Sequence, residues 1–161
     1  MLRQRSPATW PAYAAAVWAV LFAAYSIYGA LGGELGVDQL ARDIREDAEA
    51  RESGFVAELW VAGALKLVAA ALALALAFRL GQSPRSRVLL IAGWLLAAGL
   101  LIYGAANMVQ FGLMKAGAIS TPDSVGDYAV DWYLFLWEPI WLIGGIAFAA
   151  AAWSYQRHTP R

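Results

Sequence analysis

The stretch DWYLFLWEPIWLIGGIAFAAAAW, residues 131–153, decides the fold. Most of it is apolar, and its length allows a helix to cross the roughly 30 Å hydrocarbon core of a bilayer. Glu138 and Pro139 interrupt the apolar run between Trp137 and Trp141. A charged side chain at membrane depth costs about 2.5–3.5 kcal/mol on insertion scales. The stretch therefore predicts a transmembrane helix in which Glu138 requires a partner or a function.

Three further apolar segments of similar length precede this one. The four predicted spans cover residues 12–31, 55–78, 88–114 and 129–153. The chain of 161 residues is 61% hydrophobic and 15% charged, whereas soluble domains average about 25% charged residues. We therefore expect an all-α fold, a bundle of four transmembrane helices that forms one membrane domain over residues 1–161. The first span exceeds the h-region of a signal peptide, so we expect it to be retained.

Charged residues are sorted between the segments that flank the spans. The N-terminal segment, the connection at residues 79–87 and the C-terminal tail contain no acid. Their arginines are Arg3, Arg5, Arg79, Arg85, Arg87, Arg157 and Arg161. The other two connections carry most of the acids of the chain. The positive-inside rule therefore places both termini in the cytoplasm and the acidic loops outside, in a multi-pass protein of the cell membrane.

The first outer loop has a helical pattern of its own. Apolar residues recur at helical spacing between residues 37 and 48, Asp38 is placed as an N-cap, and Ser53 precedes a glycine that would end the helix. Two ion pairs at i,i+4 fit the charged face: Asp38–Arg42 and Asp47–Arg51. We expect a short amphipathic helix, which is either a lid over a site or a solvated connector.

Each predicted span places one hydrogen-bonding side chain at a similar depth. At about 1.5 Å of rise per residue, these side chains lie roughly 9–12 Å below the outer ends of their helices. They are Tyr25, Lys66, Asn107 and Glu138. The inner halves of the second and fourth spans contain almost nothing polar. We predict that this layer, with Tyr103, Trp137 and Trp141, binds a small hydrophobic or amphipathic molecule. If the protein also transports this molecule, we expect it to do so as a homodimer.

The last span contains two features that affect helix packing. Pro139 lacks an N–H and frees a carbonyl one turn earlier, so we expect a kink beside a neighbouring helix or a polar cavity. Gly144 and Gly145 are small residues suited to close approach of another helix. The tryptophans Trp137 and Trp141 lie at i,i+4 and are expected to flank Glu138 as an apolar wall.

Lys66 and Glu138 also permit a structural interpretation. A buried salt bridge between them would fix which helices pair, because such pairs are often close to neutral for stability and can serve specificity. The protein would then be an accessory or assembly subunit of a larger membrane complex, docked through its acidic outer helix.

A third hypothesis is a membrane lipid-modifying enzyme, with Glu138 as general acid or base and Lys66 or Tyr103 stabilising charge. One acid without a second carboxylate at fixed spacing favours a protein that is not an enzyme. The chain has no cysteine and one histidine, His158, in the C-terminal tail. These counts exclude disulfides and bis-histidine haem, so we expect no cofactor and no metal. No pattern for nucleic-acid binding is present.

Two motifs carry a resemblance to a known family. YSIYGALGG at residues 25–33 closes the first span, and LWEPIWLIGG at residues 136–145 lies in the last. With four spans in this length, the chain resembles a family of small four-helix bacterial integral membrane proteins of unknown function. It differs from the family pattern in having no histidine near Tyr25. The resemblance implies a four-span topology in a bacterial inner membrane, and it implies no activity.

Overall fold

The structure is a computed structural model that describes residues 9–78 and 85–158. Four long helices dominate it: α1 (Trp10–Ala30), α3 (Ser53–Ala77), α4 (Arg85–Lys115) and α6 (Glu138–His158). Two short elements run directly into α6: α5 (Gly126–Trp132) and the π-helical segment η2 (Tyr133–Trp137). The described residues form no strand. The predicted all-α, four-helix fold is therefore confirmed.

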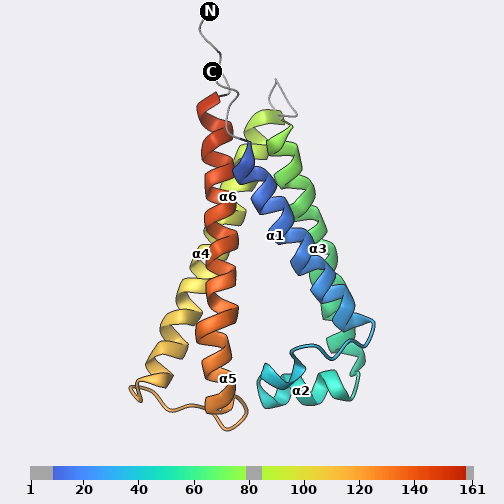
Figure 1. Cartoon of the computed structure of the whole chain (residues 1–161), viewed down its shortest axis with the longest axis vertical. Helices are drawn as coiled ribbons and strands as arrows, with labels where there is room; N and C mark the ends of the chain where they lie inside the picture. The colour runs from blue at the N-terminus through green and yellow to red at the C-terminus, as the bar shows by residue number, and fades with distance from the viewer. Residues whose placement is uncertain (1–8, 79–84, 159–161) are drawn as a thin grey trace, which may run out of the picture.

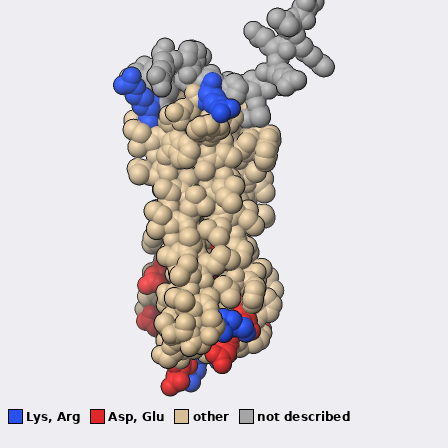
Figure 2. Space-filling model, turned by 90° about the vertical axis from the view of Figure 1, so that its left-hand side faces the viewer, with Lys and Arg blue, Asp and Glu red and all other residues tan. Residues whose placement is uncertain are grey.

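Four apolar segments are long enough to cross a membrane. They cover Trp10–Ala30, Ser53–Ala77, Arg87–Lys115 and Gly126–Arg157. Figure 2 shows the charge pattern on one face, where a broad band without charged side chains separates a basic end from an end at which acids gather. Four of the arginines used for the orientation lie outside the described residues: Arg3, Arg5, Arg79 and Arg161.

The helices pack as two pairs. α1 packs mainly on α3, α4 packs mainly on α6, and contact between α1 and α6 joins the pairs. The start of α1 and the end of α6 lie at the same end of the bundle, where the pairs are close together (Figure 1). Towards the opposite end, α1 and α3 diverge from α6, and α2 (Arg42–Glu49) lies across that end.

Small side chains explain the tight end of the bundle. Its buried core consists of alanines from three helices around the ring of Phe148: Ala15, Ala16, Ala19, Ala70, Ala73 and Ala97. In a membrane, small residues let helix backbones approach closely. The half of the bundle towards α2 has large aromatic side chains between the helices instead, among them Phe22, Tyr25, Trp137 and Trp141. These rings hold the two helix pairs apart.

Trp18 joins α1 to α6 at the boundary between the two halves. Its indole Nε1 donates a hydrogen bond to the carbonyl of Ile140 at 3.0 Å. A Cβ at Gly144 would collide with the Trp18 ring, and one at Gly145 would lie 2.7 Å from Leu101 Cγ in α4. The two glycines therefore allow side chains of two different helices, α1 and α4, to approach α6 closely, as predicted from their small size.

The proline is accommodated by a change of helix type. η2 ends directly before Glu138, whose N–H donates to the carbonyl of Tyr133, five residues earlier. Pro139 has no N–H to continue the α-helical ladder, so widening the preceding turn to a π-helix absorbs the interruption. A π-turn inside an α-helix is a recognised cause of helix bending, and here it takes the place of a simple proline kink.

The first outer loop contains the predicted short helix, although over a shorter range than the apolar pattern indicates. It contains a short 3-10 helix, η1 (Val37–Gln39), followed after a break by α2. The break occurs because two N–H groups bond outside the loop. Ala41 N donates to Tyr133 Oη at 3.4 Å, and Arg42 N donates to the Ser124 carbonyl at 2.7 Å. The N-cap of α2 is Ala41, so the N-cap predicted at Asp38 is wrong.

The predicted ion pairs of this loop are also wrong. The described residues of α2 form two others, each at 4.0 Å: Arg42–Glu46 and Arg45–Glu49. The break before α2 removes Asp38 from the helix, and Arg51 lies beyond its end. Arg51 Nη2 instead donates to the carbonyl of Ala30 at 3.1 Å. It thereby caps the C-terminal end of α1, where a cation complements the helix dipole.

Candidate functional site

A cavity of about 330 Å³ lies where the two helix pairs diverge. Its wall is formed by α1, α3, η2, the start of α6 and the first outer loop, with Tyr103 from α4. Phe55 and Leu59 come from the first turns of α3, while Lys66 lies more than three helical turns from Ser53, where α3 starts. The cavity therefore runs from the outer loop down to the depth of Lys66. Its volume is at the lower end of the range for small-molecule sites.

Lys66 is held at the deep end by one hydrogen bond and two aromatic rings. Its Nζ donates to Ser26 Oγ at 2.6 Å. The same amino group lies 5.8 Å from the ring centroid of Phe22 and 5.6 Å from that of Trp141. Contact with aromatic faces stabilises a cation that is removed from water. Lys66 is thus positioned by α1 and α6, although it belongs to α3.

Glu138 is the most deeply buried charged side chain among the described residues, with 2% of its surface exposed. The side-chain amide of Asn107, from α4, hydrogen-bonds to its carboxylate. One carboxylate oxygen, Oε2, is buried and has no hydrogen-bond partner among the described residues. The adjacent indole nitrogen, Trp137 Nε1, is likewise buried without a partner there. Both residues line the cavity, so one unpartnered acceptor and one unpartnered donor are buried in the side chains that form its wall.

The buried salt bridge between Lys66 and Glu138 is not formed. Both residues line the cavity, but no ion pair within 4.0 Å joins them among the described residues. The reason is the divergence of α3 from α6, together with the rings of Phe22 and Trp141 that flank the amino group. Each charged group has a neutral partner of its own instead.

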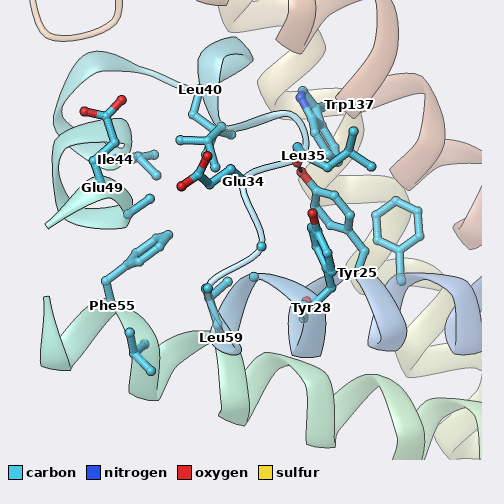
Figure 3. A pocket seen from close by; sticks show the side chains of 18 of the residues that line it. Tyr25, Tyr28, Glu34, Leu35, Leu40, Ile44, Glu49, Phe55, Leu59 and Trp137 are labelled. Atoms are coloured by element: carbon cyan, nitrogen blue, oxygen red, sulfur yellow. Dashed lines mark hydrogen bonds between the residues drawn. The ribbon is translucent and has the colours of Figure 1, made fainter. Parts of the chain in front are cut away.

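Tyr25 connects the cavity to the outer loop. Its hydroxyl donates to the carbonyl of Leu35 at 2.9 Å, and its ring lies 5.4 Å from that of Trp137. Gly36 follows with a φ of 81°, a left-handed conformation that favours glycine and turns the chain into η1. Figure 3 shows Tyr25, Leu35 and Trp137 gathered on one side of the cavity.

The outer loop covers the other side of the cavity with apolar side chains. Ile44 and Ala48 of α2 line the cavity, as do Leu40 and Val37. Figure 3 shows Ile44 facing Phe55 and Leu59 of α3, while the carboxylate of Glu49 points away. The helix is therefore amphipathic as predicted, and its apolar face is directed into the cavity.

The structure brings together six of the seven residues predicted for the site. Those in the cavity wall are Tyr25, Lys66, Tyr103, Trp137, Glu138 and Trp141. Asn107 is outside the wall and contacts Glu138. Sequence reasoning did not assign Phe22 or the direct role of Ser26. Their spacing gives a signal, because Phe22, Tyr25 and Ser26 are at i, i+3 and i+4 and share one face of α1.

Four apolar helices around a partly polar cavity define the class: an integral, multi-pass membrane protein built as a four-helix bundle. The chain belongs to the family described as Protein of unknown function (DUF3995), whose model matches residues 19–148. That match extends from α1 into α6 and includes the whole cavity wall. No curated protein and no solved structure matches the chain.

Proposed function

We propose that this protein binds a small amphipathic molecule in the cavity beneath its first outer loop. The polar end of the ligand contacts the deep layer formed by Lys66, Trp137 and Glu138. Its apolar part contacts the aromatic and aliphatic side chains nearer the loop. In this proposal the loop faces the outside of the cell, and both termini lie in the cytoplasm.

The observation that carries the proposal is the pair of unpartnered atoms, Glu138 Oε2 and Trp137 Nε1. A buried polar atom without a hydrogen bond costs about 1–3 kcal/mol, and more when the group is charged. Both residues line one cavity, although the two atoms themselves are buried. In this proposal the ligand supplies their partners once small side-chain movements turn these atoms towards the cavity.

The packing of the bundle supports the same conclusion. In the half near the start of α1 and the end of α6, the helices pack closely through alanines, and this packing involves no charged residue. The half near the loop contains Lys66 and Glu138, each of which is expensive to place at membrane depth. Because these two residues do not pair with each other, a salt bridge between the two helix pairs gives no reason for their presence. A role in binding accounts for both of them.

Native mass spectrometry of the protein released from nanodiscs tests the proposal. We expect an additional bound mass on wild-type protein and its loss in Glu138→Gln. Glu58→Gln is the matched control, because Glu58 is exposed on α3 and lies outside the cavity wall. Wild-type protein without bound mass, or equal bound mass in wild type and Glu138→Gln, would contradict the proposal.

A further inference from the structure

We infer that the ligand is electrically neutral and that its polar end is a hydroxyl or a carboxamide, a group that both donates and accepts hydrogen bonds. This inference rests on the proposed function, and it specifies the chemistry of the molecule that the cavity takes. It comes from the charges at the deep end of the cavity and from the hydrogen-bonding capacity that remains there.

The charges at the deep end are already balanced. Lys66 and Glu138 line this part of the cavity, and the other charged residues of the wall belong to the outer loop and its ends: Glu34, Glu49 and Arg51. A ligand with one net charge would leave an excess charge at membrane depth, where it is costly. A neutral ligand leaves the balance between Lys66 and Glu138 unchanged.

The unfilled hydrogen-bonding positions are of both kinds. Trp137 Nε1 can only donate, and Lys66 has three donors, of which Ser26 accepts one. Glu138 Oε2 is an acceptor. A ligand carboxylate only accepts and would face the carboxylate of Glu138, while an ammonium only donates and would face Lys66. A hydroxyl or carboxamide satisfies a donor and an acceptor with one small group.

The shape of the cavity sets the orientation and size of this ligand. The polar atoms are at the deep end, and the apolar residues Ile44, Phe55 and Leu59 lie near the outer loop (Figure 3). The ligand therefore points its polar end towards the middle of the membrane, which is opposite to a phospholipid of the outer leaflet. A volume of about 330 Å³ favours a single short chain or ring.

Three probes with the same alkyl chain test the inference on the full-length protein in nanodiscs. They are decanol, decanoate and decylammonium, and binding is measured by native mass spectrometry and by the shift in Tm. We expect decanol to bind wild type about tenfold more tightly than either charged probe, a difference of about 1.4 kcal/mol. We expect Trp137→Phe, which keeps an aromatic ring but removes the donor, to weaken decanol binding.

Charge-changing variants supply a readout that a change in folding would not produce. Glu138→Gln leaves Lys66 without an opposite charge, so we expect it to gain affinity for decanoate. Lys66→Gln leaves Glu138 alone, so we expect it to gain affinity for decylammonium. Opposite shifts of the two variants towards oppositely charged probes would not follow from a general loss of stability.

Each remaining outcome overturns the inference. If decanoate or decylammonium binds wild type as tightly as decanol, the ligand class is wrong, although the proposed function stands. The ligand class is also wrong, and the proposed function stands, if no probe binds but wild-type protein carries an endogenous bound mass that Glu138→Gln loses. If no probe binds and wild type carries no such mass, the proposed function fails as well.

Discussion

Lys66 and Glu138 lie in the wall of one cavity without forming an ion pair. Lys66 Nζ bonds to Ser26 at 2.6 Å, and Glu138 bonds to Asn107. A buried ion pair would join α3 directly to α6. The observed arrangement instead leaves a charged donor and a charged acceptor on opposite helices, with neutral partners behind them and the cavity in front.

This relationship predicts where energetic coupling will be found. In double-mutant cycles, we expect Lys66→Met and Ser26→Ala to be coupled by about 1 kcal/mol, since they share a hydrogen bond within the membrane. We expect Lys66→Met and Glu138→Gln to be coupled more weakly. The measurement is the free energy of unfolding in mixed micelles. Stronger coupling between Lys66 and Glu138 than between Lys66 and Ser26 would restore the salt-bridge interpretation.

The contact between Trp18 and Gly144 gives a second prediction. Gly144→Ala places a Cβ against the Trp18 ring and disturbs the hydrogen bond to Ile140. Overpacking of this kind costs about 1–3 kcal/mol. Gly99→Ala, in α4, is the matched control, because nothing lies within 4 Å of a Cβ at Gly99. We expect the control to be neutral or slightly stabilising, and equal stability of the two variants would refute the role of Gly144.

The four spans were predictable because their signal is local. An apolar run of sufficient length predicts a membrane helix whatever its neighbours are. Each predicted range lies within a few residues of an apolar helix that is long enough to cross a membrane. The outer loop was predicted less well, because its conformation depends on distant groups. Ala41 and Arg42 bond to Tyr133 and Ser124, and no pattern within the loop reveals those partners.

The candidate site shows the same division. Depth along each helix follows from sequence position, so the shared level of Tyr25, Lys66 and Glu138 was visible in advance. The rotation of each helix about its axis could not be predicted from sequence position. Ser26 therefore emerged as the partner of Lys66 only in the structure, and Asn107 proved to be a partner of Glu138 that does not line the cavity. Opposite charges at one depth did not establish contact.

The start of α3 gives a prediction about pH. The Glu52 carboxylate accepts hydrogen bonds from the N–H groups of Phe55 at 3.2 Å and Gly54 at 2.6 Å, and these bonds lower the pKa of Glu52. Because the pKa of Glu52 is lower in the folded state than in the unfolded state, the ionised carboxylate stabilises the fold at pH values above the usual pKa of a glutamate. That contribution is lost as the pH falls through the folded-state pKa.

Glu52→Gln checks this assignment. We expect its Tm to be below that of wild type at neutral pH, with a difference that shrinks as the pH is lowered into the acidic range. Glu58→Gln is the control for removing one exposed acid from the same helix. A difference that stays constant, or grows on acidification, would show that the ionised cap does not stabilise α3.

The proposed orientation can be tested by cysteine labelling, because the chain contains no cysteine. Glu46 and Gln156 are both exposed and lie at opposite ends of the bundle. We expect a membrane-impermeant maleimide added to intact cells to label Glu46→Cys but not Gln156→Cys. Permeabilised cells supply the control, in which both variants should react. Labelling of Gln156→Cys alone in intact cells would invert the topology.

Photolabelling of the cavity tests the central claim most directly. A decanol analogue with a diazirine on its chain is irradiated with the wild-type protein in nanodiscs, and the modified residues are mapped by peptide sequencing. We expect label on residues of the cavity wall such as Phe55, Leu59 or Ile44, and removal of that label by excess decanol. Label confined to residues on the exposed surface of the long helices, such as Leu65 or Ile146, and unaffected by decanol, would contradict the existence of a binding site in this cavity.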